Sequence, residues 1–286
     1  MAGLAGATVV PARPVDGGAT ATVPPLLRIE GLTRYFGALA ALDRVSLAVA
    51  PRERRAVIGP NGAGKTTLFD LITGHLAPTR GRIVFAGEPV TGLPPDAVAR
   101  RGIGRSYQRN NAFPSLPVLE NLRLAAAAGQ PGSYDLLGGG ARRRSTGERA
   151  RAVAEAIGLA DRLDQSAGRL SYGEQRQLEI GVALAARPRL LLLDEPTAGM
   201  SPEETQRMIQ LLQALPRETT VLVIEHDMDV VFALAERITV LHHGEVLCER
   251  APAEVRADPR VYDVYLGHDR HGRDRLGHDR PRGGTP

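Results

Sequence analysis

Short apolar runs alternate with helix-like segments along most of this chain. Residues 55–58, 190–194 and 220–224 are nearly continuous apolar runs. Runs of this length and composition are typical of strands that are buried on both faces of a parallel sheet. Each run is followed by a segment whose apolar residues have helical spacing, as at 65–73 and 202–215. The alternation predicts an α/β fold built on a parallel sheet.

The pattern differs in two other parts of the chain. Residues 26–35 and 41–50 alternate apolar and polar positions in part, which predicts additional antiparallel strands near the start. From residue 109 the chain becomes helical, with an alanine-rich segment at 121–128 and a longer helix at 141–159. We therefore expect a helical subdomain at about 109–170, inserted between strands of the first sheet.

The two ends of the chain have the composition of disordered segments. Residues 1–25 are rich in Ala, Gly and Pro and lack a basic start, so disorder is preferred to a cleaved signal peptide. Residues 267–286 repeat Gly-His-Asp-Arg, and a solvated tail is preferred to a metal site at their histidines. A single domain is expected at 26–266.

Composition narrows the classes of function. The formal net charge is +4, and no basic stripe is interleaved with aromatic residues, so nucleic acid is not an expected partner. Cys248 is the only cysteine, which excludes a disulfide within the chain. No apolar run reaches the roughly 18–20 residues of a membrane span, so we expect none.

The segment 59–67 reads Gly-Pro-Asn-Gly-Ala-Gly-Lys-Thr-Thr and fits the phosphate-binding loop pattern Gly-x-x-x-x-Gly-Lys-[Ser/Thr]. It lies between an expected strand and an expected helix, as that loop requires. Glycines let backbone N–H groups converge on one point, and the start of the helix favours an anion there. The nucleotide-binding candidates are Gly59, Asn61, Gly62, Gly64, Lys65, Thr66 and Thr67.

Lys65 is the only lysine in the chain, and every other basic side chain is arginine or histidine. A compact ammonium fits a narrow phosphate site that a planar guanidinium does not fit. We expect Lys65 to bind the β- and γ-phosphates and the Thr66 hydroxyl to bind Mg²⁺.

Polar residues follow several of the expected strands. In an open α/β sheet, ligands bind beyond the carboxyl ends of the strands. Asp194 is a candidate Mg²⁺ ligand, and Glu195 is a candidate general base, a role that contributes about 10²–10⁴-fold to rate. His226 could hydrogen-bond the γ-phosphate, and Gln108 could contact Mg²⁺ and the attacking water. A structural role for these four residues is the competing interpretation.

A second anion site is predicted at another helix start. Ser171 and Glu174 form a capping-box pattern, and Gly173 lies between them. One nucleotide does not need two such sites in one subunit. Two subunits that face each other head to tail would use both.

Taken together, residues 26–266 resemble the ATP-binding subunit of ABC transporters. The resemblance matches 59–67 to Walker A, Gln108 to the Q-loop, 170–175 to the signature, and 190–194 to Walker B. Glu195 and His226 match the residue after Walker B and the switch histidine. It implies a P-loop NTPase fold with a RecA-like parallel-sheet core, an antiparallel β subdomain and the inserted helices. Phe36 matches the aromatic residue that stacks on adenine, with Tyr35 as the alternative.

Further stretches are similar to the ATPases of branched-chain amino acid importers, among them Pro-Thr-Ala-Gly-Met-Ser-Pro at 196–202 and Val-Tyr-Leu-Gly at 264–267. Tyr172 and Glu174 depart from the general signature, and Ser201 stands in the D-loop where an aspartate is usual. An ATPase of a lipid or lipopolysaccharide exporter and a non-transport ABC ATPase remain alternatives.

The resemblance implies ATP and Mg²⁺, a second ATPase subunit, integral-membrane permease subunits and, indirectly, an external solute-binding protein. It places the chain at the cytoplasmic face of the inner membrane as a peripheral subunit. We expect the permease to dock near 108–119, where Phe113, Pro114 and Leu116 are apolar. Core packing of these three side chains is the alternative.

Overall fold

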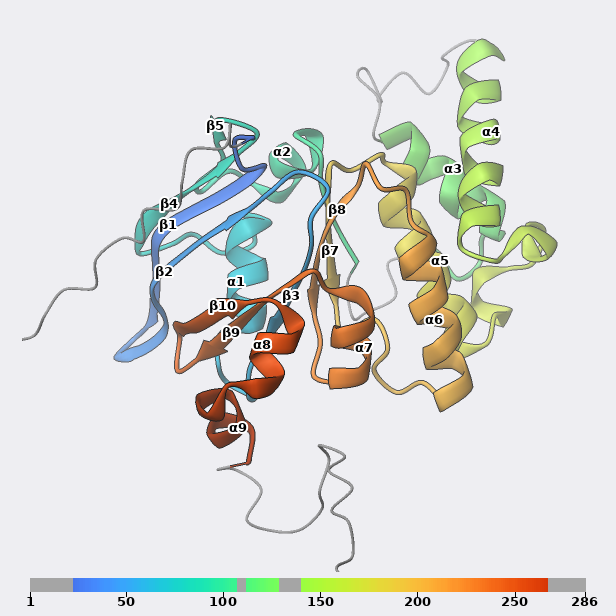
Figure 1. Ribbon diagram of the computed structural model, residues 1–286. Helices are drawn as coiled ribbons and strands as arrows, with labels where there is room; N and C mark the ends of the chain where they lie inside the picture. Colours follow the sequence, from blue (N-terminus) through green and yellow to red (C-terminus); the bar gives the residue numbers. More distant parts are fainter. Residues whose placement is uncertain (1–22, 107–111, 129–139, 267–286) are drawn as a thin grey trace, which may run out of the picture.

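The computed structural model describes residues 23–106, 112–128 and 140–266 (Figure 1). The expected tail 267–286 lies outside these ranges, as does most of the expected N-terminal extension 1–25. Gln108 also lies outside them.

A six-stranded sheet forms the centre of the molecule, with strand order β10-β9-β3-β8-β7-β6. Neighbouring strands are parallel except for β9 and β10, which form an antiparallel hairpin around His243 and Gly244. The strands are β3 (Arg54–Ile58), β6 (Ile103–Arg105), β7 (Leu190–Asp194), β8 (Thr220–Ile224), β9 (Arg237–His242) and β10 (Glu245–Arg250). Every residue of β3, β7 and β8 is buried, which explains their uninterrupted apolar character.

A smaller antiparallel sheet has the order β2-β1-β4-β5. Its strands are β1 (Leu27–Phe36), β2 (Leu39–Val49), β4 (Arg80–Phe85) and β5 (Glu88–Pro89). Helix α1 (Lys65–Ile72) lies between the two sheets (Figure 1). One apolar cluster joins α1 to both of them, through Phe69 and Ile72 of the helix, Ile83 and Phe85 of β4, and Leu222 of β8 among others.

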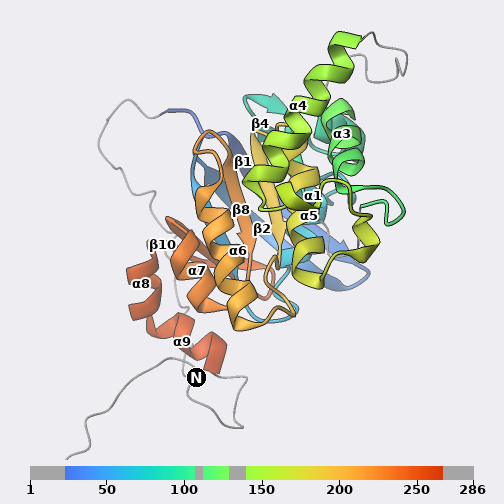
Figure 2. The same ribbon diagram turned by 90° about the vertical axis from the view of Figure 1, so that its right-hand side faces the viewer.

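Helices cover the opposite face of the central sheet. A second apolar cluster joins that face to them, for example through Leu122, Ile157 and Leu178 packed with Leu191 and Leu193. The helices of this cluster are α3 (Val118–Ala128), α4 (Gly140–Ala156), α5 (Tyr172–Ala185), α6 (Pro202–Ala214) and α7 (Met228–Leu234), and of these α3 and α4 pack on α5. Figure 2 shows one end of α4 extending beyond the rest of the molecule, with α3 beside it. The other helices are α2 (Pro95–Arg100), α8 (Pro252–Ala257) and α9 (Pro259–Leu266), with 3-10 turns at Ala160–Arg162 and Ala167–Arg169.

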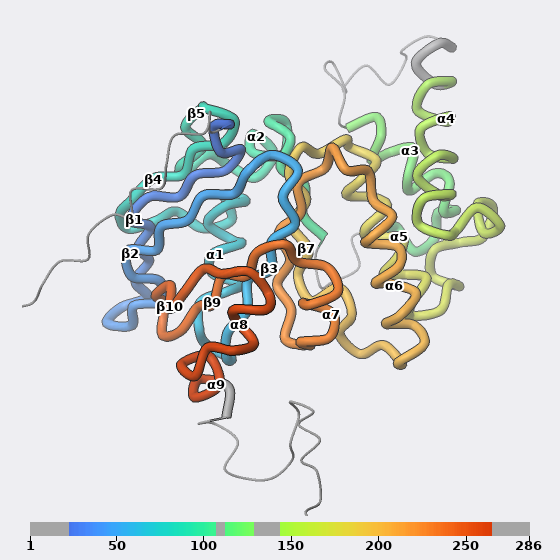
Figure 3. Tube along the Cα trace, in the orientation of Figure 1, coloured from blue at the N-terminus to red at the C-terminus, as the bar shows by residue number. Residues whose placement is uncertain are grey.

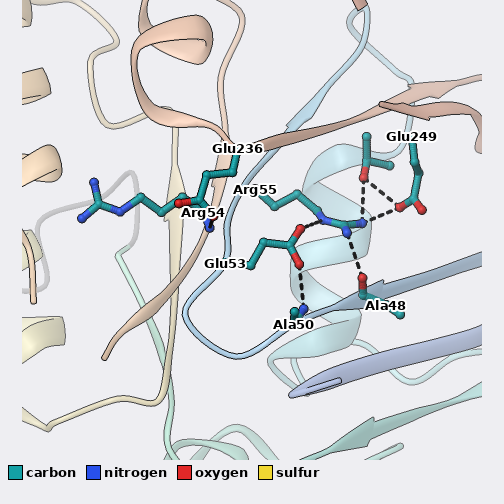
Figure 4. A network of polar contacts seen from close by, with 8 residues as sticks. Ala48, Ala50, Glu53, Arg54, Arg55, Glu236 and Glu249 are labelled. Carbon is teal, nitrogen blue, oxygen red and sulfur yellow. Dashed lines mark hydrogen bonds and ion pairs between the residues drawn. The ribbon is translucent and has the colours of Figure 1, made fainter. Parts of the chain in front are cut away.

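Segments distant in sequence meet where the two sheets join. Strands β2 and β10 lie side by side, and Asp43 N donates to Gly244 O at 2.8 Å (Figure 3). The same join contains the buried Arg55 guanidinium, which donates to Glu53 at 2.7 Å, to the Ala48 carbonyl at 2.8 Å, and to Glu249 (Figure 4). These bonds link β3 to β2 and β10, so both sheets share one buried ionic cluster.

The α/β fold with a second, antiparallel sheet is therefore confirmed. The expected strands 190–194 and 220–224 match β7 and β8 residue for residue. Strand β6 ends at Arg105, and Ser106 N continues its hydrogen bonding by donating to Leu192 O at 2.9 Å. The helical region expected at about 109–170 contains α3 and α4, and its boundaries as a subdomain stay a prediction.

Candidate active site

The parallel strands β3, β8 and β7 end at one edge of the central sheet. Their register pairs Val57 with Ile224 and Ile224 with Asp194. The residues that follow these strands are therefore neighbours in space, as the sequence predicts. They include the loop after Ile58, the pair Asp194 and Glu195, and His226.

The loop after β3 requires glycine at its two ends. Gly59 has φ +152°, and a Cβ there would lie 2.2 Å from the Leu241 carbonyl oxygen. Gly64 has φ +100°, and a Cβ there would lie 2.5 Å from the Ala41 carbonyl oxygen. Neighbouring backbone thus excludes any side chain at these positions.

Helix α1 begins directly after this loop and has no side-chain cap. Its N-cap is Gly64, so no side chain of the N-cap accepts from the first amides of the helix. Asn61, Gly62 and Thr66 are exposed around it, and Thr67 is half-buried. This helix start can therefore donate its amides to an anion.

The ammonium of Lys65 lies inside the loop. It donates to the carbonyl oxygens of Gly59 at 2.7 Å and Pro60 at 3.1 Å. Burial lowers the pKa of Lys65, and the carboxylates of Glu195 and Asp194 act in the opposite direction. The ammonium and both carboxylates therefore belong to one electrostatic site.

Asp194 is buried at the end of β7, and one of its two carboxylate oxygens, Oδ2, is paired with the Arg105 guanidinium. Arg105 donates to its Oδ2 at 3.0 Å and to Asp70 Oδ1 at 2.6 Å. Among the residues that the structure describes, Asp194 Oδ1 has no hydrogen-bond partner. Burial raises the pKa of Asp194, although Arg105 opposes this. A buried oxygen without a partner fits a hydrated Mg²⁺, for which carboxylate and hydroxyl oxygens are suitable ligands.

Glu195 and His226 face each other across the end of the sheet. His226 Nδ1 lies 3.9 Å from Glu195 Oε1, and the His226 side chain is 60% exposed. Glu195 has φ +48°, a left-handed conformation that is unusual for a residue other than glycine. Two groups capable of proton transfer and hydrogen bonding are thus adjacent to the phosphate loop.

Two residues that the sequence analysis did not assign support this edge. Glu225 is fully buried and accepts hydrogen bonds from Thr197 and from His226 N. Arg105 joins Asp194 to α1 through Asp70. The only signal for Glu225 in the sequence is an acidic residue directly after an apolar strand. No comparable signal marks Arg105.

The second predicted anion site has its capping box as expected. Ser171 Oγ accepts from Glu174 N at 3.3 Å, and Glu174 Oε2 accepts from Ser171 N at 2.8 Å. Ser171 is exposed. Gly173 is buried beneath Glu204 of α6, and a Cβ at Gly173 would lie 2.8 Å from Glu204 Oε1. All the atoms that such a Cβ would meet belong to the flexible Glu204 side chain, so this contact alone does not require a glycine.

Tyr172 connects this helix start to the loop after β7. Its hydroxyl donates to the Ala198 carbonyl at 2.9 Å, and Arg176 donates to the same hydroxyl at 3.1 Å. Ala198 begins the segment 198–201, which is the predicted D-loop and ends at Ser201. The tyrosine that departs from the general signature thus ties the signature to that loop.

The remaining predicted residues lie at the surface. Phe36 is 45% exposed, and the Arg34 guanidinium is 4.8 Å from the centre of its ring. Phe113 is 57% exposed, Pro114 is exposed and Leu116 is half-buried. The backbone of Phe113 is bonded in both directions to the buried Asn121 side chain of α3, at 2.7 and 3.1 Å. These apolar groups are therefore presented on a fixed support.

A phosphate loop, a buried acidic strand end and a facing histidine define a P-loop nucleotide-hydrolysing protein, and the capped α5 start adds an ABC-type signature. The chain belongs to the ABC transporter family, which matches residues 42–198. It is an ATPase of that family.

Curated relatives extend the likeness over most of the chain. It is 40% identical over 250 residues to the high-affinity branched-chain amino acid transport ATP-binding protein BraF of Pseudomonas aeruginosa, covering 85% of this chain and 98% of BraF. It is 41% identical over 250 residues to the corresponding LivG of Salmonella typhimurium, with the same coverage.

A solved ATP-binding cassette of an ABC transporter, in its ADP conformation, is 32% identical and has a TM-score of 0.75. That comparison covers 85% of this chain and 99% of the cassette.

Among the helices of the described residues, none combines the length and the apolarity that crossing a bilayer requires.

Proposed function

We propose that this chain is the ATP-hydrolysing subunit that powers an importer of branched-chain or related amino acids. The observation that carries the proposal is the convergence of Lys65, Asp194, Glu195 and His226 at one sheet edge. The names of the relatives, which this chain matches over 98% of their length, support the class of solute. The variant signature and residues 264–267 favour this branch over an exporter ATPase.

In this proposal ATP binds over the start of α1. Lys65 and the amides of the loop hold the β- and γ-phosphates, and the left-handed Gly59 and Gly64 keep the backbone close to them. Phe36 stacks on the adenine. Thr66 and Asp194, with Gln108, would hold Mg²⁺, which would supply positive charge to neutralise the phosphate oxygens.

Hydrolysis requires a positioned water. Glu195 accepts a proton from that water as it attacks the γ-phosphate, and Gln108 helps to orient it. His226, 3.9 Å from Glu195, donates a hydrogen bond to the γ-phosphate. The water adds to phosphorus as the bond to the β-phosphate oxygen breaks, which yields ADP and inorganic phosphate.

A second ATPase subunit completes the site. Ser171, Gly173 and Glu174 lie at a separate helix start, so we place them over the γ-phosphate of the partner. The exposed Ser171 side chain can make this contact. One solved relative, 28% identical with a TM-score of 0.67, is a dimeric cassette bound to ADP and phosphate.

The transport partner is a membrane permease, and an external solute-binding protein delivers the solute to it. We place the permease contact at Phe113, Pro114 and Leu116, and the chain at the cytoplasmic face of the inner membrane. The bonds between Asn121 and Phe113 would pass a shift of this segment to α3.

Glu195→Gln tests the catalytic assignment. We expect it to retain ATP binding, to trap an ATP-bound dimer, and to lower phosphate release by about 10²-fold or more. The exposed Glu218→Gln is the matched control and should behave as wild type. Phosphate release from Glu195→Gln at the wild-type rate would remove Glu195 as the base.

Membrane co-purification tests the transport assignment. An importer ATPase should co-purify with permease subunits whose transport of branched-chain amino acids depends on ATP. Phe113→Asp should uncouple hydrolysis from transport, whereas Tyr262→Asp, at an exposed aromatic residue of α9, should not. Recovery of lipid-export subunits instead would favour the exporter alternative.

A further inference from the structure

Glu225 is a carboxylate at the centre of the site that has no part in the reaction described above. It follows β8 directly and precedes His226, and it has no exposed surface. A buried carboxylate is costly unless donors surround it. Its bonding partners therefore indicate what it does.

The two oxygens of Glu225 bind two different loops. Oε1 accepts from Thr197 N at 3.1 Å and from Thr197 Oγ1 at 2.6 Å. Oε2 accepts from His226 N at 3.1 Å and lies 3.9 Å from His226 Nδ1. The carboxylate therefore bridges the loop that carries Glu195 and the loop that carries His226.

The bridged loop contains a strained residue. Glu195 has φ +48°, a left-handed conformation that is unfavourable for a residue other than glycine. The turn is held by Glu195 N donating to Ile224 O at 2.9 Å and by Ala198 N donating to Glu195 O at 3.1 Å. Thr197, within that turn, is fixed by Glu225.

We propose that Glu225 is a positioning residue for hydrolysis, which holds Glu195 and His226 in fixed relation by bonding both loops. The proposal rests on the function proposed above. Glu225 does not contact the nucleotide. It fixes the positions of Glu195 and His226 before the nucleotide binds.

A carboxylate suits this role better than an amide. Its two oxygens accept all three bonds, from two backbone amides and one hydroxyl. A glutamine has one acceptor oxygen, so its NH₂ group would face either the Thr197 donors or the His226 amide. Either the Thr197 amide or the His226 amide would then lose its acceptor, which weakens the bond to that loop.

The test compares Glu225→Gln, Thr197→Val and Thr197→Ser. Thr197→Val removes only the hydroxyl donor with little change in shape, and Thr197→Ser keeps that donor. We expect kcat to fall about 10- to 100-fold in Glu225→Gln, because misplacement of a catalytic group by about 1 Å costs about 10²-fold. Thr197→Val should show a smaller fall and Thr197→Ser close to none, with KM for ATP and the affinity for a non-hydrolysable analogue unchanged in all three.

Amide hydrogen exchange provides a readout without turnover. Exchange at Thr197 and His226 should accelerate in Glu225→Gln, while exchange in β3 and α1 stays at the wild-type rate. Wild-type kcat and wild-type exchange in both Glu225→Gln and Thr197→Val would overturn the proposal. A fall in kcat that is accompanied by an equal fall in affinity for the non-hydrolysable analogue would also overturn the proposal.

The exchange measurement also separates this proposal from the function proposed above. A wild-type chain that hydrolyses no ATP refutes that function. In that case, faster exchange at Thr197 and His226 in Glu225→Gln would still support the proposal that Glu225 holds the two loops. Unchanged exchange would refute it.

Discussion

The starts of α1 and α5 are both predicted to bind phosphate, yet their local chemistry is opposite. Helix α1 begins at Gly64, whose lack of a side chain leaves the first amides uncapped. Helix α5 begins at Ser171, which forms a complete capping box with Glu174. One helix start is open to an anion, and the other is already satisfied by its own side chains.

The difference explains how one chain can carry two phosphate contacts with different roles. The α1 site has a buried ammonium and nearby carboxylates, so we expect it to bind a nucleotide without help from a second subunit. The α5 site offers an exposed hydroxyl and a carboxylate that pairs with Arg162 at 3.1 Å. It is suited to a contact made only when a second subunit arrives.

The largest expected effect is at the open helix start. Lys65→Ala should lower ATP hydrolysis by on the order of 10³-fold and weaken nucleotide binding, because it removes the buried cation that binds the phosphates. Lys65→Arg should also fail, since a planar guanidinium cannot replace an ammonium bonded to the Gly59 and Pro60 carbonyls. Phosphate release and titration with a fluorescent nucleotide check both. Full activity of Lys65→Arg would contradict the argument from shape.

The next effect is at the capped helix start. Ser171→Ala should lower hydrolysis by about 10- to 100-fold through loss of a hydrogen bond to phosphate, with nucleotide affinity of the single subunit unchanged. Ser171→Asp separates this role from capping, because aspartate caps helices well but repels phosphate. It should retain the melting temperature and lose ATP-driven dimerisation, measured by light scattering. Active Ser171→Asp would show that the serine is only a cap.

Tyr172→Phe should have a smaller effect. It removes the hydroxyl that bonds the Ala198 carbonyl and receives the Arg176 donor, while the ring stays in place. We expect a loss of about 0.5–1 kcal/mol in the free energy of unfolding. Urea denaturation measures this loss. Tyr35→Phe, an exposed tyrosine of β1, is the control.

The smallest expected effect is a dependence on pH. The backbone amide of Ser171 holds the pKa of Glu174 below its usual value of 4.5. A carboxyl whose folded pKa is lowered stabilises the fold above its unfolded pKa, and this contribution is lost as pH falls through the folded pKa. The stability advantage of wild type over Glu174→Gln should therefore shrink as the pH falls below about 5.5 in urea titrations. An advantage that does not change with pH would mean that charge is unimportant in this cap.

Most residues at the proposed catalytic end of the central sheet could be predicted from the sequence. The patterns that place them involve only residues that are close together in the chain. The runs 190–194 and 220–224 are strands on length and composition alone, and the phosphate loop has fixed glycines. Parallel pairing then brings Asp194, Glu195 and His226 together without further information. The capping box of α5 is likewise readable from residues three apart.

Contacts between distant residues are not predictable in this way. Arg105 and Asp194 are 89 positions apart, and nothing local to Arg105 indicates that it bonds both Asp194 and Asp70. The pairing of Glu225 with Thr197 depends on the register of β7 against β8. The cover of Gly173 by Glu204 depends on how α5 packs on α6, which no local pattern determines.

The buried Arg55 cluster has a mechanical consequence. Its guanidinium is bonded to side chains or backbone of β2, β9 and β10 while its own backbone belongs to β3. If the two sheets slid past each other, the Arg55 guanidinium would lose these partners while it remained buried, which is unfavourable. The cluster therefore couples the antiparallel sheet to the central sheet, and we expect the two sheets to move together.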